Sequence, residues 1–253
     1  MAIGIEVFSE HFKEFKDQYV VIGGMACDLL MGDAGLDFRL TKDVDMVLIV
    51  EALTDEFAKK FWQFIENGGY SARKRKSGKS EFYRFVEPKE AGYPSMIELF
   101  ARPENKVDFE YKGHLVPIHM GDEISSLSAI LLNDDYYKFI LSGRMIIDDV
   151  VILDAAHIVP LKMKAWLDLQ KEKESCLHVN DRDLRKHRQD VFRLFPVVDT
   201  SEPIYVEKSI HNDIMEFLTE MNNMELDLKA IGINLEKKII LDEYTKLYIS
   251  NEE

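Results

Sequence analysis

Cysteine is scarce in this sequence: its 253 residues include only two, Cys27 and Cys176. The two stand far apart and form no Cys-x-x-Cys pair, so their spacing indicates neither a disulfide framework nor a zinc ribbon. Long apolar runs are lacking as well, since no stretch approaches the ~20 apolar residues of a membrane-spanning helix. Residues 1–15 include four charged side chains and no apolar run of signal-peptide length. We therefore expect a cytoplasmic protein without a membrane span.

Positive charge is also in short supply. Lys and Arg total 32 against 46 Asp and Glu, which gives a formal net charge of −14 at pH 7. This balance argues against broad non-specific binding to nucleic acid, although a local basic patch stays compatible with it. With 46% apolar residues, the chain is long enough to bury a core in one large domain or two small ones.

Several common catalytic motifs are missing. The seven histidines show no His-x-His, His-x-x-x-His or His-Glu-x-x-His spacing. There is no Gly-x-Ser-x-Gly elbow, no phosphate-binding loop of the Gly-x-x-x-x-Gly-Lys-Ser/Thr type, and no Gly-x-Gly-x-x-Gly fingerprint. These absences argue against zinc proteases of that pattern, α/β-hydrolases, P-loop enzymes and dinucleotide-binding enzymes.

The most informative stretch covers residues 19–50. Residues 19–22 form a short apolar, β-branched run that predicts a buried strand, and residues 25–31 predict the first turns of a helix. Gly23 and Gly24 stand at the turn between them. A glycine pair there lets the backbone approach a ligand closely, and the helix N-terminus favours an anion. The pattern is typical of a phosphate cradle.

A pair of carboxylates follows, because Asp43 and Asp45 stand two residues apart at the head of a second apolar strand, residues 44–50. Alternate residues of a strand point to the same face, so the two carboxylates would repel each other unless a cation lay between them. Oxygen ligands favour Mg²⁺, or Mn²⁺ in its place. Together with the phosphate cradle, this pair indicates an enzyme that handles a nucleoside triphosphate.

These residues carry a family resemblance. Gly23 and Gly24 followed by Asp43 and Asp45 resemble the signature of the nucleotidyltransferase superfamily, and residues 22–26 and 38–45 resemble its AbiEii-like branch. The better-known members of that branch are toxins of type IV toxin–antitoxin systems. Eighteen residues separate Gly24 from Asp43, more than the usual spacer, so residues 32–37 are interpreted as an inserted loop. The resemblance implies an α/β fold: a nucleotidyltransferase-type mixed β-sheet core with helices, followed by a helical C-terminal region.

A third carboxylate is predicted on another strand. Glu98 lies within the apolar residues 95–101, where a charge is costly unless it is paired or bound to metal. In the resembled superfamily the third carboxylate sits beside the Asp-x-Asp strand, and Glu98 matches that position. It would complete the metal site or deprotonate the acceptor. Asp108 is the reserve candidate, although its charged neighbours are typical of an exposed hairpin.

Two helices in the second half carry the remaining candidates. The pattern is helical from Asp154, and Pro160 is expected in a first helical turn. The resembled branch has a lysine shortly before an alanine on one helix and an aspartate on the next. Lys162 and Asp190 match these, with Lys164 as a rival lysine and ordinary surface charge as the alternative reading. By the resemblance, Lys162 would neutralise triphosphate charge and Asp190 would orient it; the branch's earlier aspartate is replaced by His187.

The densest basic cluster follows a predicted amphipathic helix at residues 54–67 and precedes a predicted strand at residues 81–86. Its members are Arg73, Lys74, Arg75 and Lys76, with Lys79 nearby. The cluster is either a solvated hairpin loop or a contact for phosphates of the triphosphate or the acceptor.

The remaining segments predict the domain organisation. A helix is expected over residues 5–17, a strand over 115–120 and a helix over 123–132. Residues 136–153 read as a helix end or a hairpin that leads into a linking strand. A catalytic core would cover residues 1–121, and a mainly helical region, residues 122–253, would complete the active site. Residues 201–253 show no chemistry, and we expect them to pack against the core or a partner.

The sequence thus leads to a functional hypothesis. The enzyme would transfer a nucleoside monophosphate from a nucleoside triphosphate to an acceptor hydroxyl and release pyrophosphate. The toxin-like resemblance implies RNA as the acceptor and an antitoxin protein as a partner. One alternative is an aminoglycoside-type nucleotidyltransferase, because a cationic antibiotic suits an acidic cleft. Another is a catalytically degenerate nucleotide-binding or interaction module built on the same fold.

Overall fold

The structure, a computed structural model, describes residues 3–74, 80–101, 130, 133–175 and 179–251. The chain divides into two compact units: residues 1–124 with 144–154, and residues 125–143 with 155–253. This division differs from a single boundary at residue 121. Residues 144–154 return to the first unit because they form a hairpin whose second strand pairs with a strand of the sheet.

The first unit is built on a seven-stranded mixed sheet in the order β3-β4-β5-β2-β1-β7-β6. In the middle of it, β1 is antiparallel to β2 and parallel to β7, while β2 is parallel to β5. The fold is therefore α/β with a mixed sheet, as the sequence predicts. The strands are β1 (Tyr19–Ile22), β2 (Asp43–Leu48), β3 (Ser71–Lys74), β4 (Ser80–Val86), β5 (Met96–Phe100), β6 (Arg144–Ile147) and β7 (Val150–Leu153).

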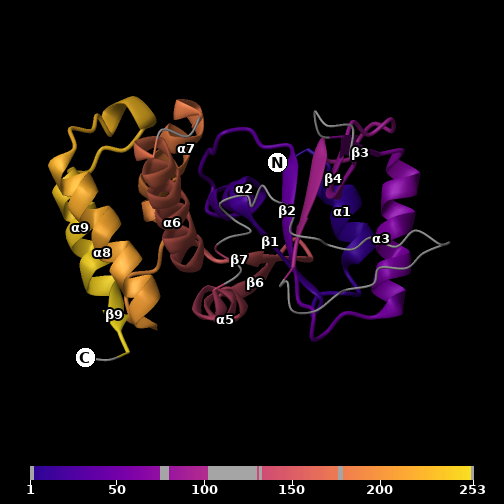
Figure 1. Cartoon of the computed structure of the whole chain (residues 1–253), viewed down its shortest axis with the longest axis horizontal. Coiled ribbons are helices and arrows are strands. Elements are labelled where there is room, and N and C mark those ends of the chain that lie inside the picture. Colours follow the sequence, from indigo (N-terminus) through magenta and orange to yellow (C-terminus); the bar gives the residue numbers. More distant parts are fainter. Residues whose placement is uncertain (1–2, 75–79, 102–129, 131–132, 176–178, 252–253) are drawn as a thin grey trace. The chain divides into compact units, whose positions relative to one another are not determined.

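Helices cover both faces of this sheet (Figure 1): α1 (Ile5–Phe12) and α3 (Asp55–Gly68) lie on one side and α2 (Gly23–Asp33) on the other. The two helices on the first side pack through aromatic rings, with centroids 5.3 Å apart for Phe12 and Phe64. The apolar stripe predicted on α3 is confirmed as buried, and Thr54 caps the helix by accepting the amide of Phe57. Helix α1 ends at Phe12, earlier than the predicted residue 17.

The second unit is mainly helical. Its helices are α5 (Asp134–Ser142), α6 (Ala155–Glu174), α7 (Asp181–Leu194), α8 (Lys208–Asn223) and α9 (Lys237–Leu247), with short 3-10 turns at Phe195–Val197 and Lys229–Ile231. Two short parallel strands, β8 (Ile204–Val206) and β9 (Tyr248–Ser250), were not predicted from the sequence. Helix α8 buries an apolar stripe at helical spacing, formed by Ile210, Ile214, Phe217 and Leu218.

The position of Pro160 corrects a prediction. Helix α6 begins at Ala155, so Pro160 is its sixth residue and not part of its first turn. Ile158 and Val159, which precede Pro160, are buried, so the chain gains apolar packing when the helix starts before the proline. A proline at this depth costs the helix one backbone hydrogen bond.

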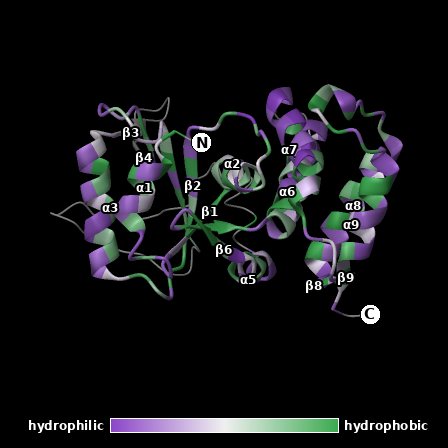
Figure 2. Cartoon of the chain, turned by 180° about the vertical axis from the view of Figure 1, so that it is seen from behind, coloured by the Kyte–Doolittle hydropathy of each residue, from purple (hydrophilic) through white to green (hydrophobic). Residues whose placement is uncertain are grey.

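Helix α3 is amphipathic, as Figure 2 shows by the alternation of green and purple along it. Within the described part of the chain, no helix is both long and apolar enough to span a membrane. The strand predicted over residues 115–120 lies outside the described residues, as does the helix predicted over 123–132 apart from Ile130.

Candidate active site

The strand register assembles a row of side chains across the first unit's sheet. Asp45 of β2 pairs with Ile22 of β1 on one side and with Glu98 of β5 on the other. Glu98 in turn pairs with Arg84 of β4. Residues paired across neighbouring strands point to the same face, so two carboxylates and a guanidinium lie in one row. We refer to Asp43, Asp45 and Glu98 as the carboxylate row.

The row lies on the face that α2 covers. Tyr19 stacks with Phe57 of α3, at a centroid distance of 6.5 Å. Ile22, three residues further along β1, points to the opposite face, because side chains alternate along a strand. Asp45 shares that face with Ile22, so the carboxylate row and the start of α2 belong to the same side of the sheet.

Gly23 brings the glycine pair and the carboxylate row together. Helix α2 begins at Gly23, which has φ +71°, and a Cβ added there would lie 2.1 Å from Oδ2 of Asp45. The Asp45 carboxylate therefore lies against the backbone at the helix start, where the first amides have no partner within the helix. Both the left-handed φ and this close approach require glycine at position 23.

Asp43 completes the row on the solvent side. It is exposed, Asp45 is partly buried, and the two share a face of β2. Two carboxylates in this arrangement offer hard oxygen ligands to a divalent cation, so the pair fits Mg²⁺ by its donor chemistry. Within the described residues, however, no group of three or more His, Cys, Asp or Glu side chains is arranged to hold a metal ion.

Glu98 has a different environment from the other two carboxylates. It is 5% exposed and forms an ion pair with Arg84, whose side chain is 20% exposed. A buried carboxylate needs a cation or a metal, and Arg84 supplies the cation here. The structure thus places Glu98 beside Asp45, as predicted, but paired with arginine; its part in binding metal stays a prediction.

Arg39 was missed as a candidate. It belongs to the segment between α2 and β2, and its Nη2 lies 3.2 Å from where a Cβ of Gly24 would be, with Thr41 Oγ1 at 2.9 Å. This long connection therefore returns to the start of α2 and brings a guanidinium to the glycine pair. The sequence signal for this role is the positive charge of residues 38–45, which include Arg39 and Lys42 before the two aspartates.

In the second unit, Lys162 of α6 and Asp190 of α7 form an ion pair with Nζ and Oδ2 3.1 Å apart. Both are buried, at 5% and 0% exposure. The rival Lys164 pairs instead with Asp168 at 3.0 Å and Asp213 at 3.4 Å. Ordinary surface charge, the alternative reading for Lys162 and Asp190, is therefore wrong.

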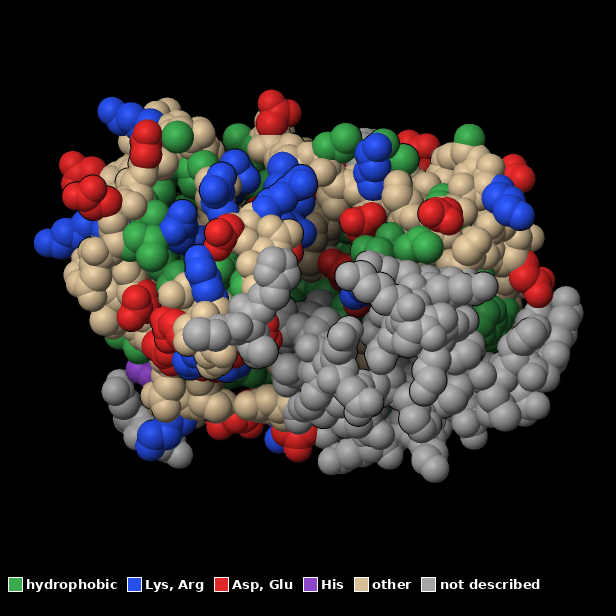
Figure 3. All heavy atoms as spheres, turned by 45° about the horizontal axis from the view of Figure 1, so that its top comes forward, with side chains coloured by type: hydrophobic (Ala, Val, Ile, Leu, Met, Phe, Trp, Pro, Cys, Tyr) green, Lys and Arg blue, Asp and Glu red, His purple; other side chains and the backbone are tan. Residues whose placement is uncertain are grey.

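The basic cluster is described only in part. The backbone of Arg73 and Lys74 belongs to β3, with a bulge between Ala72 and Arg73. Arg75, Lys76 and the reserve carboxylate Asp108 lie outside the described residues. Elsewhere the acidic chain does present basic surface: Figure 3 shows Lys and Arg side chains gathered on part of one face.

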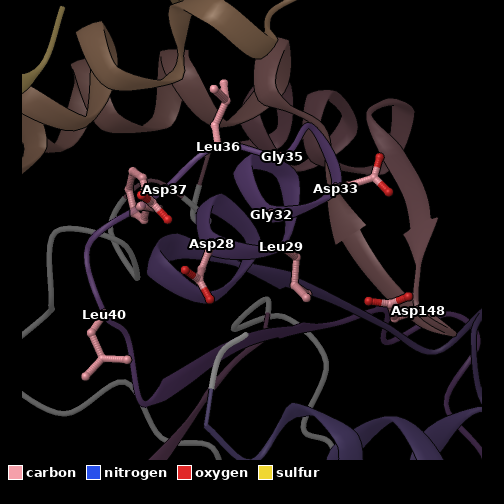
Figure 4. A pocket seen from close by; sticks show the side chains of 10 residues that line it. Asp28, Leu29, Gly32, Asp33, Gly35, Leu36, Asp37, Leu40 and Asp148 are labelled. Carbon is pink, nitrogen blue, oxygen red and sulfur yellow. The ribbon is translucent and has the colours of Figure 1, made fainter.

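A separate cavity of about 640 Å³ lies beside the second half of α2 (Figure 4). Four carboxylates reach it, from Asp28, Asp33, Asp37 and Asp148, together with apolar side chains such as Leu29 and Leu36. Burial raises the pKa of Asp28, and Arg39 opposes that rise. None of the predicted catalytic residues lines this cavity, which we call the acidic pocket.

Comparison of the chain with protein-family models, with curated proteins and with solved structures finds no match.

Proposed function

We propose that the chain is a Mg²⁺-dependent nucleotidyltransferase of the type that its sequence resembles. The observation that supports this most strongly is the arrangement around Asp45. Asp45 pairs with Glu98 in the register of β2 and β5, and the Asp45 carboxylate lies against Gly23 at the start of α2. Two motifs that stand far apart in the sequence thereby meet in one place, as a triphosphate and its metal would require.

The roles follow from the positions of the groups. Gly23 and Gly24 would present backbone amides to the triphosphate at the start of α2, where the helix dipole favours an anion. Arg39, next to Gly24, would add a fixed positive charge. Asp43 and Asp45 would hold Mg²⁺, which when bound would supply positive charge to stabilise the negative charge on the phosphate oxygens.

Glu98 would accept the proton of the acceptor hydroxyl, while Arg84 holds its carboxylate in the row. Because Arg84 pairs with Glu98, the cation is assigned to the other two carboxylates of the row, Asp43 and Asp45. The assignment of Lys162 to the triphosphate stays a prediction from the family resemblance. The same holds for an RNA acceptor and an antitoxin partner.

The test uses purified protein with each labelled nucleoside triphosphate, Mg²⁺, and either total RNA or a panel of aminoglycosides. We expect labelled RNA and release of pyrophosphate, both abolished by Asp45→Asn. Replacement of Arg73, Lys74, Arg75 and Lys76 by Ala should raise the KM for RNA and flatten its dependence on salt, if these residues contact backbone phosphates. Transfer by Asp45→Asn at the wild-type rate would refute the proposal.

Two other outcomes have support from particular observations. The acidic pocket would suit a cationic acceptor such as an aminoglycoside, and labelled antibiotic in place of labelled RNA would show this. The Arg84–Glu98 ion pair occupies the third carboxylate and would suit a module that binds nucleotide without catalysis. Nucleotide binding without any labelled product or pyrophosphate would favour that module.

A further inference from the structure

Two tyrosines of the C-terminal segment donate hydrogen bonds to the helices that carry Lys162 and Asp190. The Tyr248 hydroxyl donates to the backbone oxygen of Ala156 in α6 at 2.6 Å. The Tyr244 hydroxyl donates to the backbone oxygen of Val191 in α7 at 2.8 Å. Both tyrosines are fully buried, so neither hydroxyl has water as a substitute partner.

The acceptor in α6 is a carbonyl that the helix itself cannot satisfy. In a regular helix, the oxygen of residue 156 would accept the amide of residue 160. Residue 160 is Pro160, which has no N–H. The Tyr248 hydroxyl donates to the Ala156 oxygen in place of that missing amide. Pro160, where the amide is missing, stands two residues before Lys162. The proline that the local sequence pattern fails to explain thus has its partner in the C-terminal segment.

The acceptor in α7 is of the same kind. Val191 follows Asp190 directly and lies in the last turn of α7, where carbonyls lack partners within the helix. The Phe195 amide, which would reach Val191 in a regular helix, donates to the oxygen of Phe192. Tyr244 therefore supplies the donor for the residue next to Asp190.

The two hydroxyls belong to one stacked pair. The rings of Tyr244 and Tyr248 lie 6.2 Å apart, with 28° between their planes. Tyr248 also starts β9, which pairs with β8, and the amide of Asn251 donates to Val206 at 3.0 Å. The segment is thus anchored on the C-terminal side of the tyrosines, and the stacking keeps the two rings together.

We propose that Tyr244 and Tyr248 are positioning residues that set the backbone of α6 against that of α7, so that Lys162 meets Asp190. The C-terminal segment then has a function that its own sequence does not reveal: it holds this buried ion pair in register. A consequence for nucleotide binding rests on the proposed function, in which Lys162 neutralises triphosphate charge.

The test measures how well Lys162 is protected in the protein itself. Wild type, Tyr244→Phe, Tyr248→Phe and the double variant are treated with a small amine-reactive reagent, and the labelling rate of each lysine is read by mass spectrometry. Phe keeps the stacked rings and removes only the hydroxyls. The loss of one buried hydrogen bond corresponds to about a three- to tenfold change in an opening equilibrium. We expect the labelling rate of Lys162 to rise by such a factor in each single variant and further in the double.

Lys237 provides an internal reference in the same unit, because its Nζ donates to three backbone oxygens, those of Met221, Asn222 and Met224, at 2.7–3.0 Å. Its labelling should stay constant; a parallel rise would mean that the whole unit has loosened and would overturn the proposal. Tyr70→Phe is the matched control, since it removes a tyrosine bond to the backbone oxygen of Pro94 in the first unit. It should leave Lys162 protected.

A rescue variant makes the test specific. Pro160→Ala restores the amide that Ala156 lacks, so Tyr248→Phe combined with Pro160→Ala should label Lys162 at close to the wild-type rate. Tyr244→Phe should not be rescued in this way. If Tyr248→Phe fails to fold, recovery of the fold by Pro160→Ala supports the same conclusion, and failure to recover contradicts it.

The labelling result and the enzymatic result separate the two proposals. In an active enzyme, the Phe variants should raise the KM for the triphosphate about three- to tenfold with little change in kcat. If Lys162 loses protection but no variant and no wild type transfers a nucleotide, the positioning role stands and the proposed function fails. If Lys162 stays protected in the folded double variant, the positioning role is refuted whatever the activity.

Discussion

Among the described residues, each unit has an ion pair with a deeply buried carboxylate, and the two pairs differ in their surroundings. In the first unit, Arg84 and Glu98 meet on the sheet with side chains 20% and 7% exposed. In the second, Lys162 and Asp190 meet between helices with side chains 6% and 0% exposed. The first pair also has a second carboxylate, that of Asp45, next to Glu98 in the strand register.

The comparison shows that a buried ion pair alone says little about function, since the cost of desolvating the two charges largely cancels their Coulomb attraction. The residues around each pair are more informative. Around Glu98, the row holds two further carboxylates, those of Asp43 and Asp45, to which the proposed function assigns the cation. Lys162 pairs with one carboxylate, that of Asp190, and in our proposal the backbones of α6 and α7 set the geometry of that pair.

The largest expected loss of stability comes from breaking the more deeply buried ion pair, Lys162 with Asp190. Asp190→Asn removes the negative charge that pairs with the buried Lys162 ammonium, which should lower the free energy of unfolding by about 3–5 kcal/mol. Urea unfolding, followed by a probe in the second unit, measures this. Asp181→Asn is the control, because it removes an exposed partner of Lys173 from the same helix and should change stability little. Equal effects of the two substitutions would contradict the account.

The corresponding change in the first unit should have a smaller effect and respond to metal. Arg84→Met keeps most of the side-chain volume but leaves Glu98 beside Asp45, at a cost of about 2 kcal/mol because the site reaches solvent. Mg²⁺ should recover part of that loss, since a third carboxylate becomes available to it. Thermal unfolding with and without Mg²⁺ tests this. A Mg²⁺ response no larger than that of the wild type would argue against Glu98 as a possible ligand.

A backbone change should disturb the first unit more mildly. In Gly23→Ala the new methyl group would clash with the Asp45 carboxylate, and alanine would have to adopt a left-handed φ. The substitution should therefore lower the free energy of unfolding by about 1–2 kcal/mol and displace that carboxylate. Gly32→Ala in the same helix meets no atom within 4 Å and should stabilise by about 0.5–1 kcal/mol. Thermal unfolding of both variants gives the comparison. Similar stability changes would show that Asp45 does not lie against Gly23.

The sequence predicts well where the signal is local. The strand and helix around Gly23, the strand that starts at Asp43, and the amphipathic helix α3 all follow from short-range periodicity and turn chemistry. Glu98 was found because a charge in an apolar run needs an explanation. Its partner Arg84 was not, because the register between β4 and β5 depends on long-range pairing that no local pattern encodes.

The same limit explains the second unit. The local sequence around Pro160 predicts a helix start. Its position inside α6 is explained by the distant Tyr248 hydroxyl, which donates to the carbonyl that the proline leaves without an amide. Strands β8 and β9 have three residues each, too short for a period-2 pattern to be recognised. The return of residues 144–154 to the sheet is likewise fixed by tertiary pairing with β1.

The central claim is that Asp43 and Asp45 hold a metal that carries a nucleoside triphosphate, and binding tests it without knowledge of the acceptor. Calorimetry with a non-hydrolysable triphosphate analogue compares wild type and Asp43→Asn, each with and without Mg²⁺. Asp43 is exposed, so its substitution should leave the fold intact. The account predicts that Mg²⁺ strengthens binding to the wild type at least about tenfold, equivalent to about 1.4 kcal/mol, and that Asp43→Asn loses this gain. An Asp43→Asn variant that binds the analogue as tightly as the wild type in the presence of Mg²⁺ would contradict it.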